Sequence, residues 1–423
     1  MSVNLPYYMY HEEKNHAGTP VTAARPPLLY NQRADRDIAR VSKKPKGVKM
    51  SEFKPKKFGC GRYIQEPDAY QCLAREVEFL KAKKPFVIGG KSGLKAAEGR
   101  IAESLGEAKI PYEVEPLTTD VTYDTLDQMT ADLKAKDCDI VLATGGGKAM
   151  DMAKAVARRA DVPIICMPSS IGTFNCWSAM SVMYTPEHKP LDRIWHENEQ
   201  NCVILDTKLL AEEPVKNFAS GMADCLAKYI ETGFLLESKN VNTMPADMYT
   251  SKVMAQATND ICMNKGEKAY RDCIANTPSQ EFEDCVFSVV ATTAIAAAAN
   301  YANKNALLGA AQSEGVKGCA FAHGLYYAAR KMYTEECWGY LHGEIVGLGC
   351  RANMAMYGRS EFEVKNLGRF LDGIGQPASL KEIGMRTSDK DLEELTDCIM
   401  TVWGKHPDWH RPIILEGLHL IKG

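Results

Sequence analysis

The sequence predicts an N-terminal α/β domain built on a parallel sheet, followed by an all-helical domain. Between residues 58 and 212, short apolar runs of strand character alternate with helical segments. Beyond about residue 213 the strand signals fade, and apolar residues recur at helical spacing. Alternating strands and helices form a parallel sheet whose two faces are covered. We therefore expect one domain over 58–212, a second over 213–423, and no internal repeat.

The strands of the first domain are expected where apolar residues stand together in short runs. These runs are 86–90, 112–116, 139–143, 163–167 and 202–206. Helices are expected between them, at 94–105, 123–135 and 148–159. Within 123–135, Leu126, Met129 and Leu133 form one apolar stripe, as in a helix that covers a sheet.

The second domain is expected to consist of helices at 218–235, 286–311, 325–333, 344–356, 362–371 and 392–403. The longest uncharged run, 285–303, is rich in alanine. It falls just short of the roughly 20 apolar residues that a membrane span needs. We expect a buried helix there and no membrane partner.

Residues 1–57 differ from the rest of the chain. They contain several prolines, many charges and little periodicity. This composition predicts an extended or partly ordered N-terminal extension. It either wraps a neighbouring subunit or is dispensable.

The most informative segment is the glycine triplet Gly145–Gly147, which lies between the apolar run 140–142 and a helical run. Glycines let backbone N–H groups approach a phosphate closely, and a helix N-terminus favours negative charge. The segment therefore predicts a cradle for the pyrophosphate of a nucleotide cofactor. It is neither a P-loop nor a Gly-x-Gly-x-x-Gly turn, because Met150 stands where the third glycine would be. A purely structural turn is the alternative.

Charged residues follow the triplet at intervals of three, namely Lys148, Asp151 and Lys154. Side chains at this spacing project from one face of a helix. They either flank the anion site or are solvated surface charges.

Composition excludes several classes of protein. The net charge of −3 argues against general nucleic-acid binding, which prefers a basic patch. The fourteen cysteines are scattered, with no Cys-x-x-Cys pair and no zinc-finger spacing. They are typical of buried small hydrophobic residues in a reducing cytosol. Because no apolar signal segment follows Met1, we expect a cytoplasmic protein.

The helical half holds a candidate metal site. His323 and His342 are each followed by glycine, and Asp224 lies close to Gly221. A glycine inside a helix costs about 1 kcal/mol relative to alanine, so it suggests that something must approach closely. Two imidazoles and one carboxylate with an open position suit a catalytic Zn²⁺ or Fe²⁺. Each residue also has a structural interpretation, as a core histidine or a charge at a helix start, and the spacing alone does not decide.

At these residues the chain resembles a known family. The run from Gly145 to Lys154 resembles the signature of the metal-dependent alcohol dehydrogenase and dehydroquinate synthase superfamily, and more closely that of glycerol dehydrogenases. Further matching pieces cover roughly residues 58–400 in the family's order, namely 168–169, 178–185, 205–208, 219–224, 322–323 and 342–346. The resemblance implies a dehydroquinate synthase-like fold, with a Rossmann-like parallel sheet and an all-α C-terminal domain. It also implies a nicotinamide cofactor and a homo-oligomer.

The resemblance also implies roles for individual residues. The pyrophosphate and nicotinamide region would be held by Gly146, Gly147, Lys148 and Asp151, and the cofactor lined by Ser169, Ser178, Met180 and Tyr184. The metal would be bound by Asp224, His323 and His342. Iron-dependent members have a further histidine four residues after the aspartate, where this chain has Lys228. The pattern therefore favours zinc over iron.

Two departures from the family pattern bear on specificity. Where NAD-selective members carry an acidic residue for the ribose hydroxyl, this chain has Gly90 followed by Lys91. The missing carboxylate removes repulsion of a 2′-phosphate, which favours NADP(H) or relaxed choice over strict NAD(H). Where glycerol dehydrogenases have an aspartate that contacts the substrate, this chain has Phe174, with Asn175 as a partial substitute. We expect a less polar substrate pocket there.

The expected activity is metal-dependent, NAD(P)-linked hydride transfer between a small alcohol or polyol and its carbonyl. The metal would act through Asp224, His323 and His342 as the catalytic centre. One alternative is a lyase or cyclase resembling dehydroquinate synthase, and another is a non-catalytic family member acting in binding or assembly.

Overall fold

The computed structural model describes residues 59–233, 242, 244–301, 320–402 and 408–423. The predicted N-terminal extension, 1–57, lies outside the described residues. The described residues form one compact unit. The division into two domains between 212 and 213 therefore stays a prediction, and we refer below to the sheet part (59–212) and the helical part (213–423).

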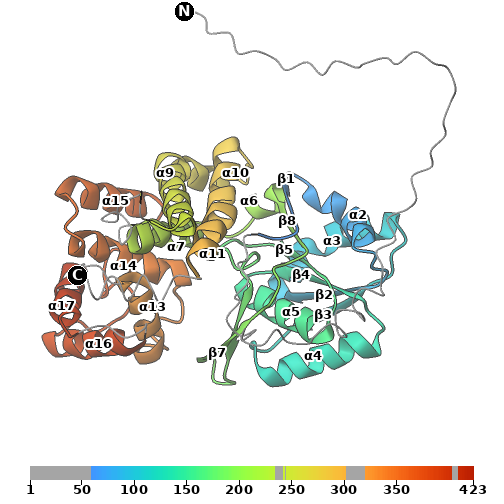
Figure 1. Ribbon diagram of the computed structural model, residues 1–423, viewed down its shortest axis with the longest axis horizontal. Helices are drawn as coiled ribbons and strands as arrows, with labels where there is room; N and C mark the ends of the chain where they lie inside the picture. The colour runs from blue at the N-terminus through green and yellow to red at the C-terminus, as the bar shows by residue number, and fades with distance from the viewer. Residues whose placement is uncertain (1–58, 234–241, 243, 302–319, 403–407) are drawn as a thin grey trace, which may run out of the picture. The chain divides into compact units, whose positions relative to one another are not determined.

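A six-stranded, fully parallel sheet forms the centre of the sheet part (Figure 1). Its strand order is β1-β8-β5-β4-β2-β3. The strands are β1 (Arg62–Glu66), β2 (Pro85–Gly90), β3 (Glu113–Leu117), β4 (Ile140–Gly145), β5 (Ile164–Pro168) and β8 (Cys202–Asp206). The predicted parallel sheet and its five predicted strands are confirmed. The edge strand β1 was not predicted, because its polar residues are only half-buried and leave no apolar run.

Helices cover both faces of this sheet. They are α2 (Leu73–Phe79), α3 (Lys91–Glu107), α4 (Tyr123–Ala135), α5 (Gly147–Ala160) and α6 (Thr207–Ala211), with a 3-10 turn at Ala69–Cys72. Alternate residues of each strand point to opposite faces. Val87 and Leu142 pack with the α2–α3 side, whereas Ile88 and Val141 pack with the α4–α5 side.

A separate two-stranded antiparallel sheet follows β5. It consists of β6 (Met180–Tyr184) and β7 (Pro190–Trp195). The sequence did not predict this hairpin, because β7 is exposed along most of its length and its apolar residues are interrupted by Asp192 and Arg193. The hairpin brings β6 alongside the start of α5, next to the predicted cofactor cradle.

The helical part contains mainly α-helices. They are α7 (Val215–Ala227), α9 (Ala246–Ile274), α10 (Gln280–Phe287), α11 (Thr293–Tyr301), α13 (Phe321–Met332), α14 (His342–Met356), α15 (Glu361–Gly373), α16 (Asp389–Val402) and α17 (His410–Leu420). Two π-helical turns, Lys228–Gly233 and Ser288–Thr292, continue α7 and α10. The helical character predicted for this part is confirmed. The prediction missed α17 and the long α9, whose buried face carries small residues such as Ser251, Ala255 and Gly266 rather than an apolar stripe.

The apolar segment Gln280–Ala299 is long and apolar enough to cross a membrane by length and composition alone. In the structure, 67% of the most apolar stretch of this helix is buried inside the protein. This is the behaviour of a core helix, as the sequence predicted for the run 285–303, of which 302–303 lie outside the described residues.

Thirteen cysteines are described, all are free, and ten of them are buried.

Glu213 is a buried carboxyl group at the start of the helical part. Its Oε2 accepts a hydrogen bond of 3.2 Å from the backbone N–H of Ile171, in the segment that follows β5. Its Oε1 has no hydrogen-bond partner within the described residues. Burial raises the pKa of Glu213 to about 8. Glu213 is therefore protonated in the folded protein at neutral pH.

We predict that Glu213→Gln stabilises the protein increasingly as the pH rises from 4.5 to about 8. The ordinary pKa of this carboxyl is 4.5. Between that value and about 8 the folded protein keeps a proton that the unfolded chain releases, so the free energy of unfolding falls as pH rises and is level above pH 8. The variant lacks this fall. Its advantage grows from near zero at pH 4.5 to on the order of 4 kcal/mol at pH 8.

Urea unfolding of both proteins at several pH values measures this difference. The matched control is Glu212→Gln, because Glu212 is exposed and pairs with Arg100 at 3.1 Å. A pH dependence that is the same in both variants would contradict the assignment to Glu213.

Candidate functional site

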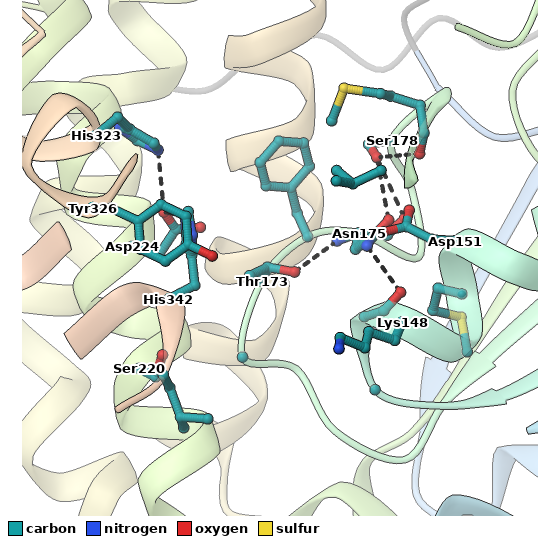
Figure 2. A pocket seen from close by; sticks show the side chains of 18 of the residues that line it. Lys148, Asp151, Thr173, Asn175, Ser178, Ser220, Asp224, His323, Tyr326 and His342 are labelled. Atoms are coloured by element: carbon teal, nitrogen blue, oxygen red, sulfur yellow. Dashed lines mark hydrogen bonds and ion pairs between the residues drawn. The ribbon is translucent and has the colours of Figure 1, made fainter. Parts of the chain in front are cut away.

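A pocket of about 750 Å³ is lined by residues from both parts of the protein. The sheet part contributes the glycine turn, the segment after β5 and strand β6. The helical part contributes α7, α13 and the start of α14. Parallel sheets bind ligands beyond the carboxyl ends of their strands, and the pocket lies at that end of β4. Figure 2 shows the pocket with its principal side chains.

The predicted phosphate cradle has the backbone that an anion site needs. Gly145 has a φ of +120°, which disfavours any residue with a side chain. A Cβ on Gly93 would lie 2.4 Å from Gly145 Cα, so α3 and the turn touch through their backbones. Helix α5 begins at Gly147 without a side-chain cap, and Gly146 and Gly147 both line the pocket. Its first N–H groups are therefore available to a phosphate.

The alternative that the charges after the triplet are simply solvated is wrong for two of the three. Asp151 and Lys154 are buried. The Lys154 ammonium donates to Asn175 O at 2.9 Å and to Ser178 O at 3.0 Å. It also donates to Met180 O, Asn175 Oδ1 and, weakly, Ser178 Oγ. One buried cation thus fixes the loop that carries three predicted site residues.

Asp151 lines the same pocket beside this ammonium. Its Oδ1 lies 3.4 Å from Lys154 Nζ. Burial raises the pKa of Asp151, and the Lys154 charge opposes this effect. The Asn175 amide donates to Gly147 O at 3.1 Å, which joins the loop to the glycine turn. Asp151 and Asn175 are therefore held where the cradle meets the pocket.

Sequence reasoning missed the residues around Lys148. Its Nζ lies 2.7 Å from Asp120 Oδ2 and 4.8 Å from the Tyr184 ring centroid. His188 Nδ1 lies 2.7 Å from the same Asp120 oxygen, and the His188 ring packs 5.4 Å from Trp338 of the helical part. Burial opposes ionisation of Asp120, but Lys148 and His188 outweigh it and hold its pKa below the usual value. No sequence pattern links these positions, which lie in four separate segments.

The three predicted metal ligands converge in the helical part. Asp224 comes from α7, His323 from the first turn of α13, and His342 is the first residue of α14. Asp224 Oδ1 lies 3.2 Å from His342 Nε2 and 3.5 Å from His323 Nε2. One ligand atom from each residue lies within 4.8 Å of the others. Two imidazole nitrogens and a carboxylate oxygen at this spacing fit a divalent zinc- or iron-type cation.

Glu231 is the partner of His323 that the sequence did not reveal. It lies in the π-helical turn after α7, and its Oε2 is 2.5 Å from His323 Nδ1. Its other oxygen accepts from the His323 backbone N–H at 3.0 Å. Burial opposes its charge, but His323 holds the pKa of Glu231 below its usual value. The ionised carboxylate keeps a proton on Nδ1, so Nε2 is the nitrogen that would ligate a metal.

The pKa of Asp224 also reflects its partners. Burial raises it, but the imidazoles of His342 and His323 hold it well below its usual range. Asp224 is therefore an ionised carboxylate in a buried position. A buried charge of this kind requires a cation or strong donors around it.

Glycines beside the ligands permit close helix contact, as the sequence predicted. A Cβ on Gly343 would lie 1.8 Å from Ser220 O, and one on Gly221 would lie 2.1 Å from Ile171 O. The Gly343 N–H donates to Ser220 Oγ at 3.0 Å. Helices α7 and α14 therefore touch through their backbones, which brings Asp224 and His342 together.

Most of the residues predicted for cofactor and substrate line this one pocket. They are Gly146, Gly147, Lys148, Asp151, Phe174, Asn175, Ser178, Met180 and Tyr184. Gly90 and Ser169 are not among the lining residues. Gly90 ends β2 beside the glycine turn, and Ser169 donates its backbone N–H to Gly145 O at 3.1 Å. Both support the turn from neighbouring strands.

Phe174 lines the pocket beside Lys228. Its ring lies 5.5 Å from the ammonium of Lys228, and both residues line the pocket. Lys228 is the first residue after α7, one turn beyond Asp224. Its charge contributes to the low pKa of Asp224 and of Glu231.

Comparison with known proteins agrees with this geometry. The family model for iron-containing alcohol dehydrogenases matches residues 60–207. A glycerol dehydrogenase of Escherichia coli O6:H1 is 26% identical over 332 residues, which make up 77% of this chain and 84% of the relative. A glycolaldehyde reductase of Halobacterium salinarum is 25% identical over 303 residues, 71% of this chain and 78% of the relative.

The fold also matches solved structures. The crystal structure of glycerol dehydrogenase from Schizosaccharomyces pombe has a TM-score of 0.73 at 19% identity, covering 87% of this chain and 91% of that one. The sheet topology, the pocket and the sequence relatives therefore agree. Residues 60–207 carry the iron-containing alcohol dehydrogenase domain, and the chain is glycerol dehydrogenase-like in sequence and in fold.

Proposed function

We propose that this protein interconverts a small alcohol or polyol and its carbonyl, using NAD(P) and a divalent metal held by Asp224, His323 and His342. The observation that carries the proposal is that this triad and the glycine turn line the same pocket. The oxidoreductase class follows from the family, which also implies NAD(H) and a divalent metal. The assignment of roles to individual residues is our inference.

A divalent metal held by Asp224, His323 and His342 would supply Lewis-acid polarisation of a substrate oxygen, and a nicotinamide would supply or accept the hydride. Glu231 fixes the His323 tautomer, so that Nε2 is free to ligate. Tyr326 and Phe174 present rings to the pocket and limit access of water. Figure 2 shows Asp151 and Asn175 on the opposite side of the pocket from Asp224 and the two histidines, where they would orient the nicotinamide end of the cofactor.

We infer zinc rather than iron. Three protein ligands with one open position are the usual arrangement of a catalytic zinc site. Iron-dependent relatives are expected to use a further histidine where this chain has Lys228, whose protonated amine cannot ligate. The proximity of Lys228 to Asp224 supports this assignment, because its charge stabilises the carboxylate instead.

We also infer a preference for NADP(H) over NAD(H). Gly90 supplies no carboxylate at the end of β2, and a Cβ there would meet no atom within 4 Å. Lys91 begins α3 directly beside this space and is exposed. A helix N-terminus with an adjacent ammonium suits a 2′-phosphate.

The family also supports two broader inferences. We infer a homo-oligomer, since the resemblance implies one. We infer a cytoplasmic location, since buried free cysteines suit a reducing compartment. The lyase and the non-catalytic alternatives are not favoured, because the relatives are dehydrogenases and reductases and the metal triad is intact.

Replacing either histidine of the triad is expected to abolish metal binding and turnover. Alanine at His323 or His342 removes one of three ligands, while the sheet and the glycine turn remain intact. Metal content after purification, turnover and NADH binding by fluorescence measure the three effects separately. His419→Ala is the control, because His419 is exposed on α17. Turnover at the wild-type rate by metal-stripped protein would contradict the proposal.

Gly90→Asp is expected to shift the cofactor preference toward NAD(H). A carboxylate in this open space repels a 2′-phosphate and accepts from a ribose hydroxyl, so the ratio of kcat/KM for NADP to that for NAD should fall about tenfold or more. Gly99→Asp is the matched control, because that exposed position of α3 also has open space. An unchanged ratio in Gly90→Asp would argue against this position as the selector.

Phe174→Asp is expected to favour more polar substrates. The new carboxylate can pair with Lys228 and accept hydrogen bonds from a polyol, so the kcat/KM ratio of glycerol to 1-propanol should rise about tenfold. Initial rates with a panel of small alcohols and diols give this ratio. Phe174→Leu serves as the control, since it removes the ring without adding charge. An equal ratio in both variants would show that charge at this position does not set selectivity.

A further inference from the structure

The two imidazoles of the triad are held in different ways. His323 has Glu231 behind it, with a carboxylate oxygen 2.5 Å from Nδ1. His342 has, among the described residues, Asp224 at Nε2 as its hydrogen-bond partner, and its side chain is 26% exposed. Metal-binding histidines usually have an outer partner that fixes the ring. The orientation of His342 therefore depends on another contact.

That contact is aromatic. The Tyr326 ring stands edge-on to the His342 imidazole, with centroids 4.1 Å apart and planes at 69°. Tyr326 lies on α13, three residues after His323. Figure 2 shows the Tyr326 ring beside Asp224 and His342. The Tyr326 ring therefore packs against His342 and restricts the orientation of its imidazole.

Arg330 packs against the Tyr326 ring. It follows Tyr326 by one helical turn, so His323, Tyr326 and Arg330 share one face of α13. The Arg330 guanidinium carbon lies 5.5 Å from the centroid of the Tyr326 ring. A guanidinium over a ring is attracted by its negative face, which restrains the ring.

The same guanidinium also holds the chain that leads into His342. Its Nη1 donates to Cys337 O at 2.7 Å, and its Nη2 donates to Tyr340 O. These carbonyls belong to the segment 333–341, between α13 and α14. Tyr340 is two residues before His342, so this hydrogen bond fixes the backbone from which the ligand projects.

We propose that Arg330 is a positioning residue for the metal centre, acting on His342 through Tyr326 and through the 333–341 segment. The inference rests on the proposed function, because it presupposes that the triad binds a divalent metal. Its chemistry requires arginine specifically. The rigid fork of a guanidinium reaches two carbonyls while its face covers a ring, which a lysine ammonium cannot do.

A purely structural role for Arg330 is the competing explanation, and the chain offers a matched control. Arg386 also lies over a tyrosine, with its guanidinium carbon 5.0 Å from the Tyr333 ring centroid. It bonds Asp391 at 3.1 Å and lies outside the pocket lining. Arg386→Met therefore removes a comparable cation–ring contact away from the metal centre.

The test is Co²⁺ binding to metal-stripped protein, followed by its d–d absorption and by chelator competition. We expect Arg330→Met to weaken Co²⁺ binding about 10–100-fold, the range typical of lost outer partners. Arg330→Lys should lie between this variant and wild type. Arg386→Met should bind Co²⁺ as wild type does. NADH binding, measured in the same preparations, should be unchanged in all three.

A second variant guards against misfolding. Tyr326→Leu leaves both carbonyl hydrogen bonds of Arg330 intact and removes the ring together with its hydroxyl, which also bonds Arg330, so it should also weaken Co²⁺ binding and alter the d–d spectrum. Equal Co²⁺ affinity in Arg330→Met and wild type would overturn the inference alone. The same loss in Arg386→Met would overturn it too, by assigning the effect to general stability. Failure of wild-type protein to bind Co²⁺ would overturn the proposed function and this inference with it.

Discussion

The backbone contact of α7 with its neighbours is the constraint on which the site depends. A side chain on Gly343 would collide with Ser220 O of α7, and one on Gly221 would collide with Ile171 O. Helix α7 is therefore in backbone contact with α14 on one side and with the segment after β5 on another. Asp224 lies one turn beyond these contacts. The distance between Asp224, the proposed metal ligand, and the sheet is thus set by missing Cβ atoms rather than by adjustable side chains.

On the side of the predicted cofactor cradle, the buried ammonium of Lys154 fixes the positions of the site residues. Lys154 holds the carbonyls of Asn175 and Ser178, which lie between β5 and β6, and the carbonyl of Met180 at the start of β6. Ammonium burial is costly unless several acceptors surround the charge, and here carbonyls and the Asp151 carboxylate provide them. These hydrogen bonds tie the segment between β5 and β6 to α5, the helix that carries Lys154. Rigid placement on both walls is what a hydride transfer between two bound molecules requires.

What the sequence could reveal follows from how each element is stabilised. The strands at 140–145 and 164–168 are predictable, because buried parallel strands are continuous apolar runs. The edge strand at 62–66 and the hairpin at 180–195 are not, because half of their surface faces water. Helix α9 escapes prediction because small residues, not large apolar ones, form its buried face.

The residues of the site also fall into those that the sequence could predict and those that it could not. Asp224, His323 and His342 could be named from a resemblance in sequence, yet their spacing carries no sign that they meet. Glu231 and Arg330 could not be named, because their roles exist only through contacts with segments far away in the chain. Single charged residues of this kind look like any solvated charge in a sequence. Only the folded arrangement separates an outer partner from a surface residue.

The charges around the triad finally bear on why Lys228 is tolerated there. Two carboxylates, Asp224 and Glu231, lie close together in a buried region, and Lys228 supplies one positive charge beside them. If both imidazoles are neutral, a bound divalent cation would bring the net formal charge of this group to +1. A net positive centre in a low-dielectric pocket favours negative charge on a substrate oxygen. A neutral histidine in place of Lys228 would leave this net charge at zero. At the proposed metal centre, Lys228 would therefore favour the ionised form of the substrate.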